Sequence, residues 1–223
     1  MVNYFLFLVA SSIEYFGAFM FMFALFRFRI RRQLVYNILL VSFLMSQVSY
    51  FTRINPGIDE FSTYIQFVLF IIVFWILFLI PLFHSIIMNF AGVASGIVIQ
   101  GLFILLFTQT SGQTMNSLID NVWIASAIQI LSSIIHLALA RTIVIWNWGF
   151  DFVPTSPRSN VRINGTNAIL IGIISFAIVI SAFLAYIFKS NLNVYVACAS
   201  IIFILTLPAF IYFSARKDNE DAT

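Results

Sequence analysis

The segment from Tyr4 to Gln33 constrains the fold more than any other part of the chain. Between Tyr4 and Phe26 nearly every residue is apolar and the one charged residue is Glu14, after which four arginines follow (Arg27, Arg29, Arg31 and Arg32). An apolar run of about twenty residues is long enough to cross a bilayer as a helix. Basic residues directly after such a run are typical of its cytoplasmic end. The segment therefore predicts a membrane-spanning helix and the sidedness of the residues that follow it.

Apolar runs of similar length occupy most of the remaining chain. Of the 223 residues, 62% are hydrophobic and 9% are charged, which leaves no room for a separate soluble domain. We expect a single integral membrane domain over residues 1–223, an all-α polytopic transmembrane helix bundle of six to seven spans. Seven spans can be drawn, at about residues 3–26, 34–52, 62–83, 85–107, 120–140, 167–188 and 193–214.

The third and fourth spans are separated by very few residues. Pro81 and the polar residues His84, Ser85 and Asn89 leave little room for a connection. Two arrangements remain open: a tight hairpin between two crossings, or one crossing that is tilted and broken. In the last span we expect the helix to end near Pro208, with a frayed charged tail from residue 216 to residue 223.

Basic residues are distributed unevenly between the two sets of connections. With the N-terminus outside, nine fall on the cytoplasmic side (Arg27, Arg29, Arg31, Arg32, Arg141, Arg158, Arg162, Arg216 and Lys217) and two on the outer side (Arg53 and Lys189). This positive-inside bias favours an odd number of spans, an outer N-terminus and a cytoplasmic C-terminus. We interpret the first four arginines as a topology anchor, with anionic lipid of the inner leaflet as their counter-charge.

The longest connection, residues 142–166, is cytoplasmic in this orientation. Its aromatic residues suit the membrane interface, where amphipathic rings settle; they are Trp146, Trp148, Phe150 and Phe152. At its end, Asn164 or Thr166 is expected to cap the next helix.

Glu14 is the residue of the first span that most needs an explanation. At 1.5 Å per residue it lies about 16 Å below Asn3, near the middle of a hydrocarbon core of about 30 Å. A carboxylate there costs about 2.5–3.5 kcal/mol unless it is protonated or paired. It is either a structural hydrogen-bonding group between helices or part of a functional site, and intramembrane ionisable residues more often mark the latter.

Other polar side chains fall at similar depths. In the fifth span, Ser126, Gln129, Ser133, His136 and Ala140 are spaced 3, 4, 3 and 4, a polar stripe along one helix face. Measured from the outer ends of their helices, Gln100 is about 12 Å deep and Gln129 about 14 Å deep. We predict an outward-facing polar pocket for ligand binding or coupling, formed by Glu14, Gln47, Gln66, Gln100, Gln129, Ser133 and His136. The alternative is that these residues only join helices by hydrogen bonds.

Specific chemistries find little support in the sequence. Ser95 and His136 could form a Ser–His pair, but the surrounding residues contain no recognisable oxyanion-hole motif. His136 is expected near the inner interface, bonded to backbone, and a proton-relay role stays open. Two histidines and a lone Cys198 make no metal site, and the chain has no P-loop. We expect no enzymatic activity, no cofactor and no nucleic-acid partner.

Two motifs and two loops carry a resemblance to a known family: Ile13-Glu14-Tyr15-Phe16, Leu25-Phe26-Arg27-Phe28-Arg29 and the short polar outer loops at Asn55–Glu60 and Thr108–Asp120. With these features the sequence resembles the membrane sensor region of bacterial peptide-pheromone histidine kinases of the accessory-gene-regulator type. The resemblance implies several short-looped spans in the bacterial cytoplasmic membrane, an outer N-terminus and a cytoplasmic C-terminus. The chain departs from those kinases after Phe213, where it carries no phosphoacceptor helix and no ATP-binding domain.

Two functions therefore remain open. One is a ligand-sensing or regulatory module that binds an extracellular small molecule or peptide and signals through a protein partner. The other is a small transporter, or a transporter subunit, that uses Glu14 for proton or substrate coupling. Broken helices near Pro81 and at Gly92–Gly96 would suit the second function.

Overall fold

Long apolar helices make up nearly all of the chain that the structure describes. The computed structural model describes residues 2–55, 57–58, 61–112, 118, 121–154, 165–188 and 191–221. Within these residues there is no β-strand, and the elements are α1 (Val2–Leu25), α2 (Arg32–Ile54), α3 (Ser62–Ile72), the π-helix η2 (Val73–Leu77), α4 (Leu82–Ser111), α6 (Val122–Trp146), α7 (Gly165–Ile187) and α8 (Leu192–Asp221).

Six of these helices are long and apolar enough to cross a membrane: α1, α2, α4, α6, α7 and α8. The segment Ser62–Leu77 is also apolar but shorter. At 1.5 Å per residue its length is about 24 Å, less than the hydrocarbon core of about 30 Å. The protein is thus an all-helical, multi-pass membrane protein, as the sequence predicts.

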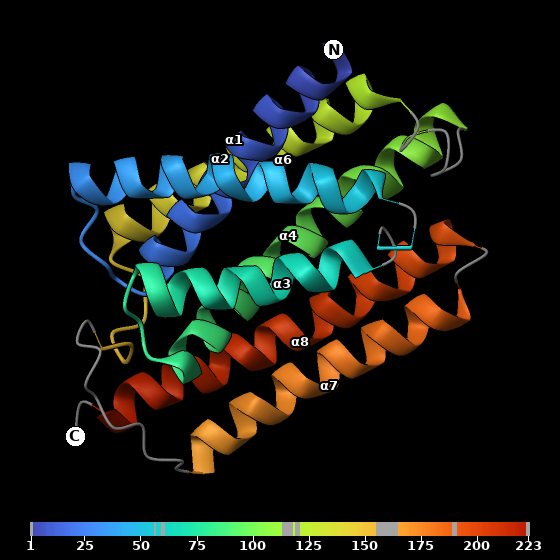
Figure 1. Ribbon diagram of the computed structural model, residues 1–223. Helices are drawn as coiled ribbons and strands as arrows, with labels where there is room; N and C mark the ends of the chain where they lie inside the picture. Colours follow the sequence, from blue (N-terminus) through green and yellow to red (C-terminus); the bar gives the residue numbers. More distant parts are fainter. Residues whose placement is uncertain are drawn as a thin grey trace.

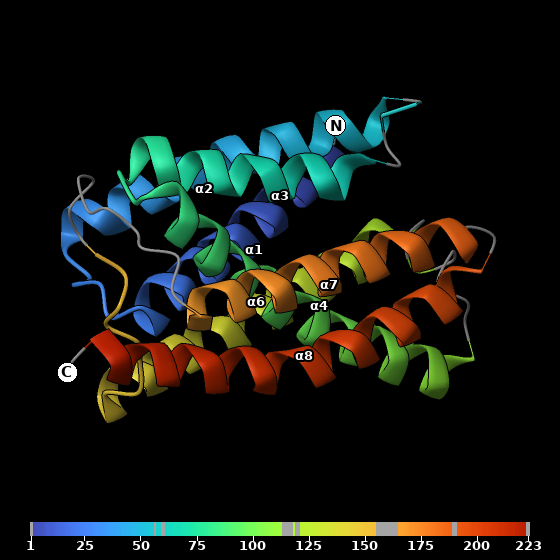
Figure 2. The ribbon, with the colours of Figure 1, turned by 90° about the horizontal axis from the view of Figure 1, so that it is seen from below.

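The chain reverses direction from each helix to the next, so that its connections gather at the two ends of the bundle (Figure 1). The N- and C-termini lie at opposite ends (Figure 1). Helix α1 packs mainly against α6 and α2, whereas α7 and α8 pair with each other. Helix α4 links the two groups, because it contacts α1, α3 and α6 as well as α8 (Figure 2).

The connection between α3 and α4 is a tight hairpin. The π-turns of η2 end at Leu77, and α4 begins directly after Pro81, whose missing N–H group suits the start of a helix. The third apolar segment therefore ends at Leu77. The expected end of the third span at residue 83 is wrong. The polar residues after Pro81 belong to α4, where the Asn89 side chain is buried and its Nδ2 donates to Phe67 O over 2.8 Å.

Helix α8 continues through Pro208 to Asp221, so the expected end near Pro208 and the frayed tail are wrong for the described residues. A proline inside a helix costs about 3 kcal/mol, which packing beyond it can offset. Phe210 is completely buried, and Lys217 Nζ lies 5.3 Å from the centre of the Phe152 ring. These contacts hold the last turns of α8 in place.

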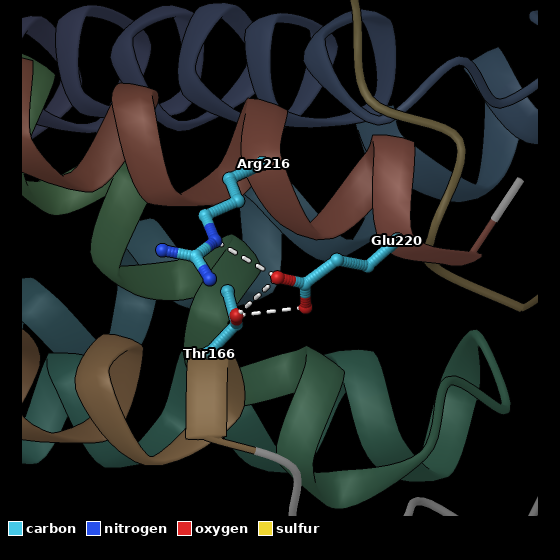
Figure 3. A network of polar contacts seen from close by, with 3 residues as sticks. All are labelled: Thr166, Arg216 and Glu220. Carbon is cyan, nitrogen blue, oxygen red and sulfur yellow. Dashed lines mark hydrogen bonds and ion pairs between the residues drawn. The ribbon is translucent and has the colours of Figure 1, made fainter. Parts of the chain in front are cut away.

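A polar network fixes the same end of α8 to the start of α7 (Figure 3). Arg216 Nε lies 2.8 Å from a Glu220 carboxylate oxygen, and the Thr166 hydroxyl, 2.9 and 2.7 Å from the two oxygens, donates to that carboxylate. Thr166 therefore joins two helices, which corrects its predicted capping role. Asn164, the other predicted cap, lies outside the described residues.

The four aromatic residues after α6 divide into two pairs. Trp146 and Trp148 are 58% and 63% exposed, which fits the predicted membrane interface. Phe150 and Phe152 do not fit it, because both are buried against the Phe26 ring. The cause is a backbone hydrogen bond of 2.8 Å from Phe150 N to Leu25 O, which draws this connection under the end of α1.

Candidate functional site

Glu14 lies where α1, α4 and α6 meet. Gln100 of α4 donates from Nε2 to Glu14 Oε1, and the Gln129 side chain of α6 lies near the same carboxyl group. All three side chains are half-buried, whereas the serines of α6 near them are fully buried. We call Glu14, Gln100 and Gln129 the Glu14 cluster. Its carboxyl and amide groups can accept and donate hydrogen bonds in an otherwise apolar bundle.

Arg53, in the last turn of α2, makes no close ion pair with Glu14. Its guanidinium group also lies 5.5 Å from the centre of the Phe7 ring, a cation–π contact that restrains its position. An acid with a distant cation and two adjacent amides can bind a donor group without breaking a close ion pair.

The close packing of α1 on α6 positions Glu14. Ser133 Oγ donates to Ile13 O over 2.7 Å. A Cβ atom at Gly17 would lie 3.1 Å from the Ser133 Cα atom, so the two helices approach as closely as they do because residue 17 is a glycine. Ser133, one of the predicted site residues, is therefore beside the Glu14 cluster and bonds the backbone of α1.

His136 forms a separate contact between α6 and α4. Its Nε2 lies 3.1 Å from Ser95 Oγ, and its Nδ1 lies 3.1 Å from Ser132 O. The second of these is the backbone contact that the sequence predicts. The ring is buried beside Phe21. Because Gln129 and His136 are seven positions apart in α6, the two side chains are about 10 Å apart along the helix.

Gln47 and Gln66 bond other parts of α1. The Tyr4 hydroxyl donates to Gln47 Oε1 over 2.6 Å, and the Tyr15 hydroxyl donates to Gln66 Oε1 over 3.2 Å. Of the seven predicted residues, the structure thus brings together Glu14, Gln100 and Gln129, with Ser133 adjacent. The other three each have partners elsewhere along α1 or α4.

Sequence reasoning missed the polar face of α2 that packs on α1. Ser42, Ser46 and Ser49 are all buried, and Ser46 Oγ accepts a hydrogen bond of 2.9 Å from Ser12. Their spacing of 4 and 3 is the helical stripe that was recognised on α6, so the signal was present in the sequence. The two tyrosines that bond Gln47 and Gln66 gave no such periodic signal.

Among the described residues, no group of three or more His, Cys, Asp or Glu side chains could hold a metal ion. Comparison with known proteins gives no further assignment, because no protein family, curated protein or solved structure matches the chain.

Proposed function

We propose that this protein is a ligand-sensing or regulatory membrane module whose receptive site is the Glu14 cluster. The proposal rests on one observation: a half-buried acid and two amides lie together, and each of the three comes from a different helix. A ligand that replaces one amide at the Glu14 carboxyl group would change how α1, α4 and α6 pack. Binding and helix rearrangement would then be coupled through a few contacts.

The chemistry of the cluster suggests the ligand class. A carboxyl group accepts hydrogen bonds and favours a positive charge, while glutamine amides accept as well as donate. The favoured ligand is a small polar molecule or a peptide segment that presents N–H or ammonium donors. Glu14 forms no ion pair with another described residue, so the free-energy cost of a carboxylate at this depth is not offset in that way. Such a ligand would compensate this cost.

The proposed orientation places this site toward the outside. We assign seven traverses, an outer N-terminus and a cytoplasmic C-terminus in a bacterial cytoplasmic membrane. The four arginines in or beside the connection from α1 to α2 lie at the same end of the bundle as the C-terminal Arg216 and Lys217, while Arg53 lies at the other end (Figure 1). This segregation supports the orientation. In the proposal, signals pass to a protein partner, as the resemblance to peptide-pheromone sensors implies, and the chain has no catalytic activity.

A transport function is the second candidate. It is favoured by the break between α3 and α4, where η2 is followed by Leu79 at a positive φ of 56°. π-Turns and strained residues often accompany functional movement. In that case Glu14 would carry a proton or bind the substrate during the transport cycle.

The two functions are separated by an experiment on Glu14→Gln, which preserves shape and hydrogen bonding but removes the acid. For sensing, conditioned medium of the source strain should raise the unfolding temperature of the wild type in nanodiscs and leave that of Glu14→Gln unchanged. Gln47→Leu is the matched control, since Gln47 lies in another contact, and it should respond like the wild type. An equal response of Glu14→Gln would overturn the sensing site. Glu14-dependent acidification of proteoliposomes with an entrapped pH dye would instead establish proton-coupled transport.

A further inference from the structure

One end of the bundle carries a group of arginines that the Glu14 cluster does not use. Arg29, Arg31 and Arg32 lie in or beside the connection from α1 to α2, and all three are exposed. The structure gives their guanidinium groups no hydrogen bond or ion pair with any described residue. Two acids at this end are engaged elsewhere: Glu220 pairs with Arg216, and Asp218 accepts from the Asp151 backbone over 2.5 Å, while the Asp151 side chain is exposed.

This arginine connection adjoins the segment that carries the two exposed tryptophans. Arg27 Nη2 donates to Asn147 O over 2.9 Å, and Phe150 N donates to Leu25 O. The two bonds hold residues 147–150 against the end of α1. Trp146 and Trp148, whose ring centres are 4.6 Å apart, therefore lie next to the start of the arginine connection.

An apolar surface continues from the tryptophans along α6. Val144 and Ile145, in the last turn of α6, are 56% and 65% exposed. The surface thus combines unpaired guanidinium groups, indole rings of the kind found at lipid headgroup level, and an apolar helix face beneath them. These three elements match, in order, the phosphate, the glycerol region and the acyl chains of a phospholipid.

We infer that this surface binds an anionic phospholipid, with Arg29, Arg31 and Arg32 at its phosphate headgroup and Trp146 and Trp148 beside its glycerol region. Guanidinium groups bind phosphate oxygens in bidentate geometry, which favours this occupant. The inference is independent of the proposed sensing function. It also goes beyond a topology anchor, because it names a defined binding site.

Quenching of tryptophan fluorescence by brominated lipid tests the site. The other two tryptophans, Trp75 and Trp123, are replaced by phenylalanine, and the protein is placed in phosphatidylcholine nanodiscs. A minor fraction of brominated phosphatidylglycerol should quench Trp146 and Trp148 more than the same fraction of brominated phosphatidylcholine. The expected local enrichment is at least about fivefold, the factor that a single basic residue contributes near an anionic surface.

Two variants distinguish binding at the site from general attraction. The triple variant Arg29→Gln, Arg31→Gln, Arg32→Gln should lose the preference for phosphatidylglycerol, while Arg53→Gln at the opposite end should keep it. Unchanged quenching of the triple variant by brominated phosphatidylcholine would show that it is still inserted and folded. Equal quenching of the unaltered site by the two lipids, or a triple variant that keeps the preference, would overturn the inference and favour docking of a protein instead.

Discussion

Glu14 shows how one residue can organise three helices. Its bond from Gln100 and its contact with Gln129 compensate part of the cost of placing a carboxyl group among apolar helices. Removal of Glu14 alone should leave both amides without their partner, and an unsatisfied buried polar group costs about 1–3 kcal/mol. Glu14→Leu should therefore lower the free energy of unfolding, measured in bicelles, by an amount in this range.

A double-mutant cycle with Gln100 separates this contact from general packing. Glu14→Leu, Gln100→Leu and the double variant should give a coupling free energy of about 0.6–2 kcal/mol, as for other hydrogen bonds between membrane helices. Gln47→Leu combined with Glu14→Leu is the control, and its effects should add. Additive effects for Glu14 and Gln100 as well would contradict an energetically significant bond.

Depth calculations predicted this cluster well because depth depends only on the helix ends. Glu14, Gln100 and Gln129 lie within a few ångströms of one level, and the structure brings all three together. The partners of Gln47 and Gln66 could not be predicted in this way. They depend on how α2 and α3 rotate about their axes, which only the packing of many side chains determines.

Helix ends were harder to predict than helix faces. The buried stripe on α6 follows from its spacing, since Ser126, Ser133 and His136 are all buried. The end of α8 does not follow from its sequence, because the cost of Pro208 is offset by contacts of Phe210 and Lys217 with distant residues. Local rules for proline could not include those contacts.

Two glycines provide a test of the contact between α1 and α6. Gly17→Ala should lower the free energy of unfolding by about 1–3 kcal/mol, because the added methyl group meets the Ser133 backbone. Gly172→Ala in α7 is the matched control: nothing lies within 4 Å of the added atom, and alanine favours the helix by up to about 1 kcal/mol. Chemical unfolding of both variants in bicelles measures the difference. A stability of Gly17→Ala equal to or above the wild type would contradict the close approach.

At the scale of the whole molecule, the two ends of the bundle differ in charge. One end carries the arginine connection, Arg216 and Lys217, and the described residues of the other end include Arg53. The chain reverses direction between successive helices, and its two termini lie at opposite ends of the bundle (Figure 1). The apolar runs of the sequence predicted the alternation of the helices, and the distribution of basic residues predicted which end is cytoplasmic, an orientation that stays a prediction.

The orientation itself can be tested with single cysteines in a Cys198→Ser background. Thr110 lies at the end of α4 and Gln33 in the first turn of α2, at opposite ends of the bundle, and both are exposed. A membrane-impermeant maleimide should label Thr110→Cys in intact cells, but should label Gln33→Cys only after permeabilisation. The reverse pattern would exclude an outer N-terminus, and with it an outward-facing Glu14 cluster.

Replacement of Arg27, Arg29, Arg31 and Arg32 by glutamine should make both cysteines partly reactive from outside, because it removes four of the charges that are expected to retain this end in the cytoplasm. An unchanged labelling pattern in that variant would contradict the anchoring role of the four arginines.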